Sequence, residues 1–256
     1  MNHLAYFLGA GPGDPELLTR RADRVLRECQ VVYVPPLYDQ AFGELLAGKE
    51  ILIPFEYYFA DLIARIRGQL TKGPVAFLVP GDMTFYSPFQ ALVDALGDQA
   101  VVVPGVGSAN AASALLKKTL DLPGVCSRTV LTSPRTLGEV PGAPTMRALA
   151  APGVTLVIYM NNLPLTELVD QLRQGYGKDV PIALAHRVGL PEEEIVLATL
   201  DSILAKVGSR DFFNLGHADR RPALTLLLVG ESLTAEADPC WWDYRRDHIW
   251  KSRDKS

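Results

Sequence analysis

The sequence predicts an α/β protein of two domains, with a parallel sheet in the N-terminal part and a mixed sheet in the C-terminal part. Short apolar runs alternate with amphipathic stretches, glycine-rich turns follow several of the runs, and helices become sparser after residue 125. The length of 256 residues suits one or two domains of roughly 100–200 residues each. A hydrophobic fraction of 48% is enough for a sizeable core.

The N-terminal part has the pattern of a parallel sheet. Apolar runs bounded by Gly, Pro or polar residues predict strands at 4–8, 31–34, 51–53, 75–79 and 100–103. Apolar side chains recur at helical spacing over 18–29, and we place further helices at about 60–70 and from Ser108 to the Pro123-Gly124 break. Such alternation predicts parallel βαβ units.

The C-terminal part has a different pattern. Strands are predicted at 129–132, 155–159, 181–185, 195–198 and 224–229, with three helices between them. The acidic turn 191–194 joins two of these strands without a helix, which indicates an antiparallel pair in a mixed sheet. We therefore expect domains at 1–119 and 125–232, followed by a tail at 233–256.

Composition and charge exclude several classes of partner. With 25 basic and 29 acidic residues the net charge is −4, which suits neither nucleic acid nor an anionic membrane. No window approaches the ~20 consecutive apolar residues of a membrane span, and the start does not resemble a signal peptide, so we expect a cytoplasmic protein. The three cysteines are far apart and the four histidines scattered, so we expect neither a disulfide framework nor a metal site.

The first glycine-rich turn spans residues 9–15, between a predicted strand and a predicted helix. Its glycines let the backbone approach a ligand closely. Asp14 replaces the third glycine of a dinucleotide-binding turn, and no Gly-Lys-Ser/Thr of a Walker loop follows. Asp14 and Pro15 also suit an N-cap and a first helical residue, so the pattern leaves a ligand site and a capped turn open.

Two further turns follow predicted strands, at residues 80–88 and 104–109. In the second turn Ser87 and Pro88 suit an N-cap and a first helical residue. The Asp82 carboxylate can accept a hydrogen bond from a ligand hydroxyl or ammonium, or from N–H groups of its own loop. Carboxyl ends of parallel strands share one edge of a sheet, so the three turns predict one ligand crevice. With no nucleophile elbow or acid–base pair visible, the pattern favours chemistry that orients two reactive partners.

In order and spacing, the three turns resemble those of the tetrapyrrole (corrin/porphyrin) methylase family. The family pattern G-x-G-P-G-D-P-x-L-L-T matches residues 9–19 at every fixed position, and the third motif matches residues 104–108. The second motif matches at Gly81, Asp82 and Phe85, with Met83 where proline is usual. Overall length, the 120–123 linker and residues 243–245 are most similar to the precorrin-4 C11-methyltransferases of that family.

The resemblance implies an S-adenosylmethionine-dependent methyltransferase that acts on a ring carbon of a precorrin or cobalt-precorrin in cobalamin biosynthesis. It implies a homodimer, with the cofactor in a cleft between the domains and S-adenosylhomocysteine as product. The cofactor residues that it implies are Pro12, Gly81, Asp82, Phe85, Gly107, Ser108, Met160, Val188 and Thr225. We expect Asp82 and Tyr86 to be the catalytic, orienting groups.

Departures from the family pattern leave other functions open. Residues 34–38 lack the usual Y-A-G-S-L-like stretch, residues 53–59 are unusually aromatic, and residues 85–87 resemble precorrin-2 C20 enzymes. The alternatives are a methylase of the same family acting on precorrin-2, uroporphyrinogen III or a protein side chain, and a non-catalytic module that binds tetrapyrrole or S-adenosylmethionine.

The tail and the charge balance raise two further expectations. The tail holds all three tryptophans, and it either docks on the core or forms a lid, a substrate arm or a strap across a partner subunit. A polycarboxylate substrate needs local basic residues to offset the net charge of −4, and Arg187, Arg220, Arg221 and the tail are the candidates.

Overall fold

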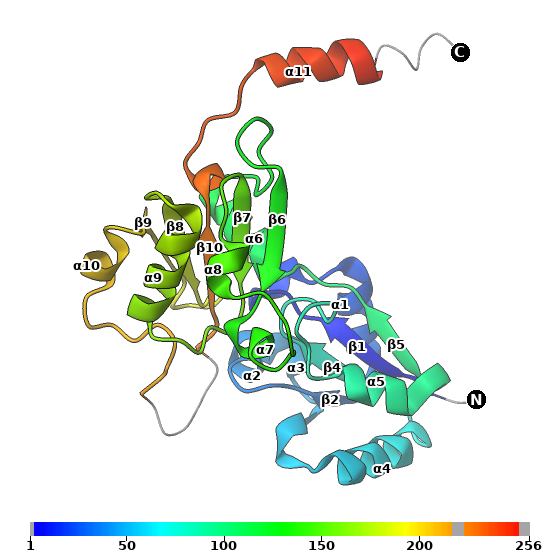
Figure 1. Cartoon of the computed structure of the whole chain (residues 1–256). Helices are drawn as coiled ribbons and strands as arrows, with labels where there is room; N and C mark the ends of the chain where they lie inside the picture. The colour runs from blue at the N-terminus through cyan, green and yellow to red at the C-terminus, as the bar shows by residue number, and fades with distance from the viewer. Residues whose placement is uncertain (1–2, 217–222, 251–256) are drawn as a thin grey trace. The chain divides into compact units, whose positions relative to one another are not determined.

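The computed structural model describes residues 3–216 and 223–250, which fold into two compact units (Figure 1). The first unit holds the chain up to Ala111 together with Arg187–Glu193, and the second holds Ala112–His186 and the chain from Glu194 onward. The sequence places 187–193 within the domain at 125–232. Its contacts are with the first unit, because this segment packs on the first glycine-rich turn.

The first unit is built on a five-stranded parallel sheet, as predicted. Its strands have the order β3-β2-β4-β1-β5. They are β1 (Ala5–Gly9), β2 (Val31–Tyr33), β3 (Glu50–Leu52), β4 (Val75–Val79) and β5 (Ala100–Val103). Because β1 lies between β4 and β5, the three strands that precede the glycine-rich turns are neighbours, and all three turns leave the same edge.

Helices cover the two faces of this sheet, and each covered face has its own core. On one face Phe77 stacks between Phe7 and Tyr33, with ring centroids 4.7 and 4.4 Å away; Leu8 and Leu78 belong to the other core. The helices are α1 (Arg20–Glu28), α2 (Tyr38–Ala41), α3 (Gly43–Leu46), α4 (Phe59–Leu70) and α5 (Gln90–Leu96). The next helix, α6 (Ser108–Leu116), begins in the first unit and continues into the second. Short 3₁₀ turns lie at Pro15–Leu17, Pro54–Glu56 and Gly97–Gln99.

The second unit is built on a five-stranded mixed sheet, also as predicted, with the order β6-β7-β10-β8-β9. Only β6 and β7 are parallel, and β8 and β9 form the expected antiparallel pair. The strands are β6 (Arg128–Thr132), β7 (Val154–Ile158), β8 (Pro181–His186), β9 (Glu194–Thr199) and β10 (Thr225–Val229).

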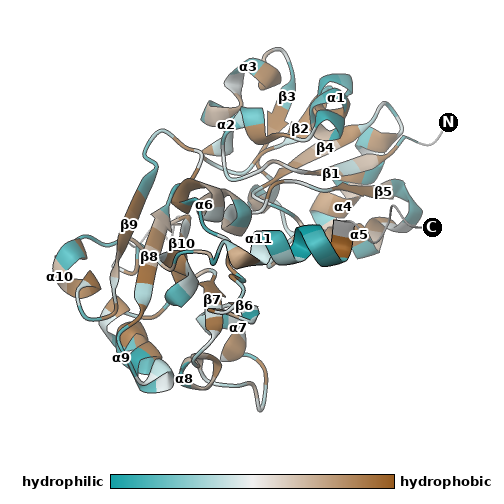
Figure 2. Cartoon of the chain, turned by 90° about the horizontal axis from the view of Figure 1, so that it is seen from above, coloured by the Kyte–Doolittle hydropathy of each residue, from teal (hydrophilic) through white to brown (hydrophobic). Residues whose placement is uncertain are grey.

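Four helices of the described chain lie between these strands, where the sequence predicts three. They are α7 (Pro134–Leu137), α8 (Met146–Leu149), α9 (Leu165–Tyr176) and α10 (Ile203–Val207). The helices α7 and α8 are single turns, too short to show a helical period. The long helix α9 has both hydrophilic (teal) and hydrophobic (brown) residues in Figure 2. Its buried residues Leu168, Val169 and Leu172 belong to the core of the mixed sheet.

The tail forms α11 (Cys240–Arg245), which continues as a π-helical segment over Arg246–Trp250 (Figure 1). Its large side chains are open to solvent, and Trp242 is 78% exposed. Within their own unit these side chains are not buried, which contradicts a tail docked on that core. No helix among the described residues has both the length and the hydropathy to cross a membrane.

Candidate functional site

The three glycine-rich turns meet at the carboxyl edge of the parallel sheet, and glycine is what lets them meet. A Cβ atom on Gly9 would lie 2.4 Å from the backbone nitrogen of Gly105. A Cβ atom on Gly105 would lie 2.6 Å from the carbonyl oxygen of Gly81. Since both contacts are with backbone atoms, only glycine allows this approach.

Backbone hydrogen bonds join the first turn to the second. The Gly11 N–H donates to the Gly81 carbonyl at 3.1 Å, and the Gly81 N–H donates to the Gly11 carbonyl at 2.7 Å. Both residues have positive φ, 73° and 68°, a conformation that favours glycine. The buried Tyr38 hydroxyl also donates to the Gly11 carbonyl, at 2.9 Å. Burial raises the pKa of Tyr38, so this hydroxyl stays a donor.

The second and third turns form a corner made of main chain. A Cβ atom on Gly81 would meet only the backbone nitrogen of Ser108, at 3.7 Å. Helix α6 begins at Ser108, and the first N–H groups of a helix have no acceptor within it. A Cβ atom on Gly107 would meet only the Asn110 side-chain oxygen, at 3.1 Å. Gly81, Gly107 and Ser108 therefore lie together, and their main-chain groups can bind a polar ligand.

The predicted side chains of the second turn have distinct environments. One carboxylate oxygen of Asp82 accepts from the Thr84 N–H at 2.7 Å, so this side chain does order its own loop. Phe85 is half-exposed, at 52%. Tyr86 has a positive φ of 55°, and partial burial raises the pKa of its hydroxyl. The structure thus places Asp82, Phe85 and Tyr86 on one short loop at the edge where the turns meet.

One of the two predicted caps is confirmed and the other is wrong. Asp14 accepts from the Glu16 N–H at 2.8 Å, with Pro15 as the first residue of the 3₁₀ turn. Ser87 instead accepts from the Phe89 N–H at 3.3 Å, and α5 begins only at Gln90. Ser87 does not cap α5, because the N-cap position of this helix is Phe89, two residues further along the chain.

Pro12 lies against the segment Arg187–Glu193 of the same unit, which contains Val188. A Cβ atom on Gly189 would lie 3.1 Å from the Pro12 ring and 2.9 Å from the Asp14 nitrogen. Leu190 fills the space beside Gly13, where a Cβ atom would lie 2.5 Å from its side chain. Val188, which precedes Gly189 in the chain, is buried. This segment covers the first turn, although it is far from it in sequence.

Met160 and Thr225 belong to the second unit, where they lie at one end of the mixed sheet. Met160 follows β7 with a positive φ of 45°, and Thr225 opens β10, which pairs antiparallel with β7. The Thr225 hydroxyl donates to the Phe212 carbonyl at 2.6 Å and lies 2.6 Å from His186 Nδ1. Because the hydroxyl has one proton, Nδ1 must be the donor in the second bond. That Met160 and Thr225 contact the cofactor stays a prediction.

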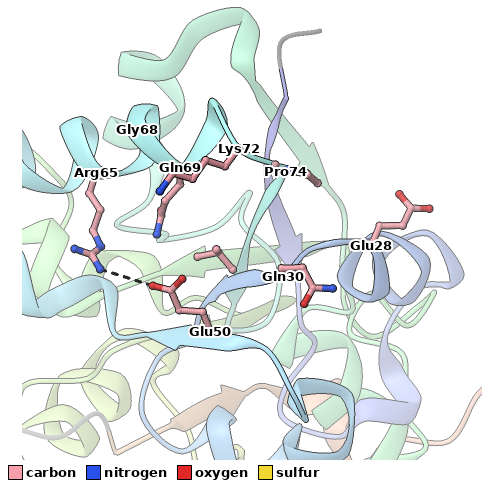
Figure 3. Close-up of a pocket in the computed structure, with 10 residues that line it drawn as sticks. Glu28, Gln30, Glu50, Arg65, Gly68, Gln69, Lys72 and Pro74 are labelled. Atoms are coloured by element: carbon pink, nitrogen blue, oxygen red, sulfur yellow. Dashed lines mark ion pairs between the residues drawn. The ribbon is translucent and has the colours of Figure 1, made fainter.

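A separate cavity lies where β2, β3 and β4 begin, at the sheet edge opposite the glycine-rich turns (Figure 3). It encloses about 590 Å³, and its charged lining residues are Glu28, Glu50, Arg65 and Lys72. Arg65 and Glu50 face each other across it at 3.8 Å. None of the predicted site residues lines this cavity. Among the described residues, no three His, Cys, Asp or Glu side chains gather in a way that could hold a metal ion.

Sequence reasoning missed one residue that contacts the first turn, Tyr38. Tyr38 reaches Gly11 across 27 residues of chain, and a hydroxyl-to-carbonyl contact of this kind follows no sequence pattern. His186, which lies one residue beyond the predicted strand, is the last residue of β8 in the structure. Arg220 and Arg221, expected to offset the acidic net charge, lie outside the described residues.

Comparison with known proteins identifies the same family as the sequence motifs. Residues 5–204 match the family described as Tetrapyrrole (Corrin/Porphyrin) Methylases. The chain is 34% identical over 248 residues to a precorrin-4 C(11)-methyltransferase of Pseudomonas aeruginosa, covering 95% of this chain and 96% of that protein.

Solved structures resemble the fold as well. A cobalt precorrin-4 methyltransferase superimposes with a TM-score of 0.75 at 23% identity, covering 90% of this chain and 96% of that one. A uroporphyrin-III C-methyl transferase of Thermus thermophilus, complexed with S-adenyl homocysteine, gives a TM-score of 0.68 at 26% identity, with coverage of 90% and 98%.

Proposed function

The chain belongs to the tetrapyrrole (corrin/porphyrin) methylase family, and on this premise we propose that it methylates precorrin-4 or cobalt-precorrin-4 at carbon 11. The methyl donor is S-adenosylmethionine, the coproduct is S-adenosylhomocysteine, and the pathway is cobalamin biosynthesis. The similarity to a precorrin-4 C(11)-methyltransferase over nearly the whole chain supports this acceptor over the other tetrapyrroles.

The observation that carries the proposal is the main-chain corner formed by Gly81, Gly107 and Ser108. A Cβ atom at Gly81 or Gly107 would occupy space that glycine leaves open, and the backbone nitrogen of Ser108, the first residue of α6, faces Gly81. A related structure contains S-adenyl homocysteine, the demethylated form of the proposed donor. We propose that Gly81, Gly107 and Ser108 hold the cofactor through main-chain groups, together with Pro12, Asp82, Phe85, Val188, Met160 and Thr225.

The residues of this site bind and orient rather than react. When bound, S-adenosylmethionine supplies a methyl group already activated on a sulfonium, so the protein has to align it with an electron-rich ring carbon. The Asp82 carboxylate is held by its bond to the Thr84 N–H, and Tyr86 lies on the same loop with a positive φ, so both belong to the turn that we assign to the cofactor. We propose them as the groups that orient the two reactants.

A methyl-transfer assay with labelled S-adenosylmethionine tests the proposal. Precorrin-4, cobalt-precorrin-4, precorrin-2 and uroporphyrinogen III are offered in turn, and the methylated carbon is located by NMR. We expect methylation of precorrin-4 or its cobalt form at carbon 11. Methylation of another acceptor would replace the substrate, and binding of S-adenosylhomocysteine without any turnover would indicate a non-catalytic binding module.

We also propose that the enzyme is a cytoplasmic homodimer. Trp241, Trp242 and Tyr244 of α11 are exposed, with the rings of Trp241 and Tyr244 in contact, and a second copy of the chain would bury these aromatic side chains. The exposed free thiol of Cys240 suits a reducing compartment. Sedimentation of the full chain and of residues 1–238 tests the dimer. We expect the full chain to be a dimer and the truncated chain to dissociate more readily, whereas a monomeric full chain would contradict the proposal.

A further inference from the structure

Arg187 is the first residue of the segment that covers the first glycine-rich turn. The segment is tightly held: the Leu190 N–H donates to the Arg187 carbonyl at 2.9 Å, and the Gly189 N–H donates to the Glu193 carboxylate at 2.8 Å. Gly189 and Leu190 then pack on Pro12 and Gly13. The backbone of Arg187 is therefore fixed relative to the turn that we assign to the cofactor.

The conformation of Arg187 is unusual for its residue type. Its φ is 49°, in the left-handed region that a side chain with a Cβ atom rarely adopts. Its Nε atom is buried and makes no hydrogen bond with the described residues. A strained backbone and a buried, unsatisfied donor are both unfavourable, and such features concentrate where a protein binds a ligand.

The charge partner of Arg187 is a weak one. Its Nη1 atom lies 3.4 Å from a carboxylate oxygen of Glu192, whose side chain is 62% exposed. Close pairs of this kind lie at about 2.7–2.9 Å. Arg210, by contrast, places one nitrogen 2.8 and 3.0 Å from the two oxygens of Glu194. The guanidinium of Arg187 thus has hydrogen-bonding capacity that Glu192 does not use.

We propose that Arg187 binds a carboxylate of the tetrapyrrole acceptor and that this carboxylate displaces Glu192. The inference rests on the proposed function, because precorrins carry acetate and propionate side chains. A guanidinium binds such a group through two parallel hydrogen bonds, and the side chain of Arg187 is 27% exposed, which leaves it accessible to one. A chain of net charge −4 also needs a local cation to accept a polycarboxylate.

Paired variants at Arg187 and Glu192 test the proposal. Arg187→Gln should raise the KM for the acceptor about tenfold to a hundredfold, the range expected for losing hydrogen bonds to a charged group, with the Kd of S-adenosylhomocysteine unchanged. Glu192→Gln removes the competing carboxylate and should leave the acceptor KM equal or lower. If Glu192→Gln raises the acceptor KM as much as Arg187→Gln does, the ion pair stabilises the loop and does not bind the acceptor, and the proposal is wrong.

Arg187→Gly separates binding from folding. Glycine accepts a φ of 49° without strain, so this variant should melt at the wild-type temperature or above it while losing acceptor affinity. Quenching of intrinsic fluorescence by uroporphyrin III, a stable polycarboxylate, gives a readout that needs no turnover. Uroporphyrin affinity and acceptor KM that are unchanged in Arg187→Gln and Arg187→Gly would overturn the inference. An inactive wild type that binds uroporphyrin through Arg187 would count against the proposed function alone.

Discussion

Gly105 is the residue on which the arrangement of the three turns depends most. Its Cα position brings the third turn against the end of β1 and against the carbonyl of Gly81, so there is no space for a Cβ atom. The glycines of all three motifs are visible in the sequence, which is why the meeting of the three turns could be predicted from it. Which glycine touches which could not, because that depends on the order of the strands.

Gly105→Ala should therefore destabilise the protein. An overpacked methyl group costs about 1–3 kcal/mol, and here the neighbours are backbone atoms that cannot rotate away. Gly107→Ala is the matched control, since its Cβ atom would meet only the end of the flexible Asn110 side chain. Urea unfolding of the two variants measures the difference; equal free energies of unfolding would contradict the account of the turns.

Other features of single residues leave no trace in the sequence. The contact of Tyr38 with Gly11 joins two segments through one hydroxyl, and the strained φ of Arg187 is a property of the folded loop. The sequence did name Arg187 as a candidate cation, from charge balance alone. Its buried Nε atom and its loose pairing with Glu192 became visible only in the structure.

At the scale of elements, strands were predicted better than helices. All ten strands of the two sheets lie within one residue of their predicted bounds at each end. A short apolar run bounded by glycine or proline is typical of a buried strand, so its two ends are marked in the sequence. The short helices α2 and α3 were missed, because four residues show no helical period.

Helix caps show how sequence alone can select the wrong residue. Ser87 and Thr19 both precede helices, but only Thr19 caps one: its hydroxyl accepts from the Ala22 N–H at 3.2 Å, at the start of α1. The same hydroxyl lies 3.4 Å from the Pro104 carbonyl and so joins α1 to the third turn.

Thr19→Ala should lower the free energy of unfolding by about 1 kcal/mol, the usual cost of losing an N-cap. Thr19→Ser keeps the oxygen and should restore most of that loss. Ser87→Ala should change the free energy by less than about 0.5 kcal/mol, because Ser87 caps no helix. Chemical denaturation of the three variants checks these values, and a larger loss in Ser87→Ala than in Thr19→Ala would contradict the assignment of caps.

At the scale of the whole molecule, buried titratable groups couple stability to alkaline pH. Burial raises the pKa of Tyr33 from 10.0 to about 12 and that of Cys29 from 9.0 to about 11. Burial also raises the pKa of Tyr176 in the second unit. As pH rises through the ordinary values, the unfolded chain loses these protons while the folded chain keeps them. Deprotonation therefore favours the unfolded state.

The free energy of unfolding should accordingly fall as pH rises above about 9, by up to about 1.4 kcal/mol per pH unit for each group in its window. Tyr33→Phe removes one such group and should flatten the decline between pH 10 and 12. The measurement is urea unfolding across this range. The same slope in wild type and variant would show that Tyr33 ionises freely in the folded protein.

The central claim concerns where the molecule binds its cofactor, and calorimetric titration with S-adenosylhomocysteine tests it most directly when two glycine variants are compared. Gly107→Val fills the main-chain corner, whereas Gly73→Val places the same side chain beside the cavity at the opposite edge of the sheet, in open space. We predict tight binding to the wild type, the same affinity for Gly73→Val, and loss of binding for Gly107→Val with a cooperative melting transition retained. Unchanged affinity in Gly107→Val, or loss of affinity in Gly73→Val alone, would contradict the assignment of the site.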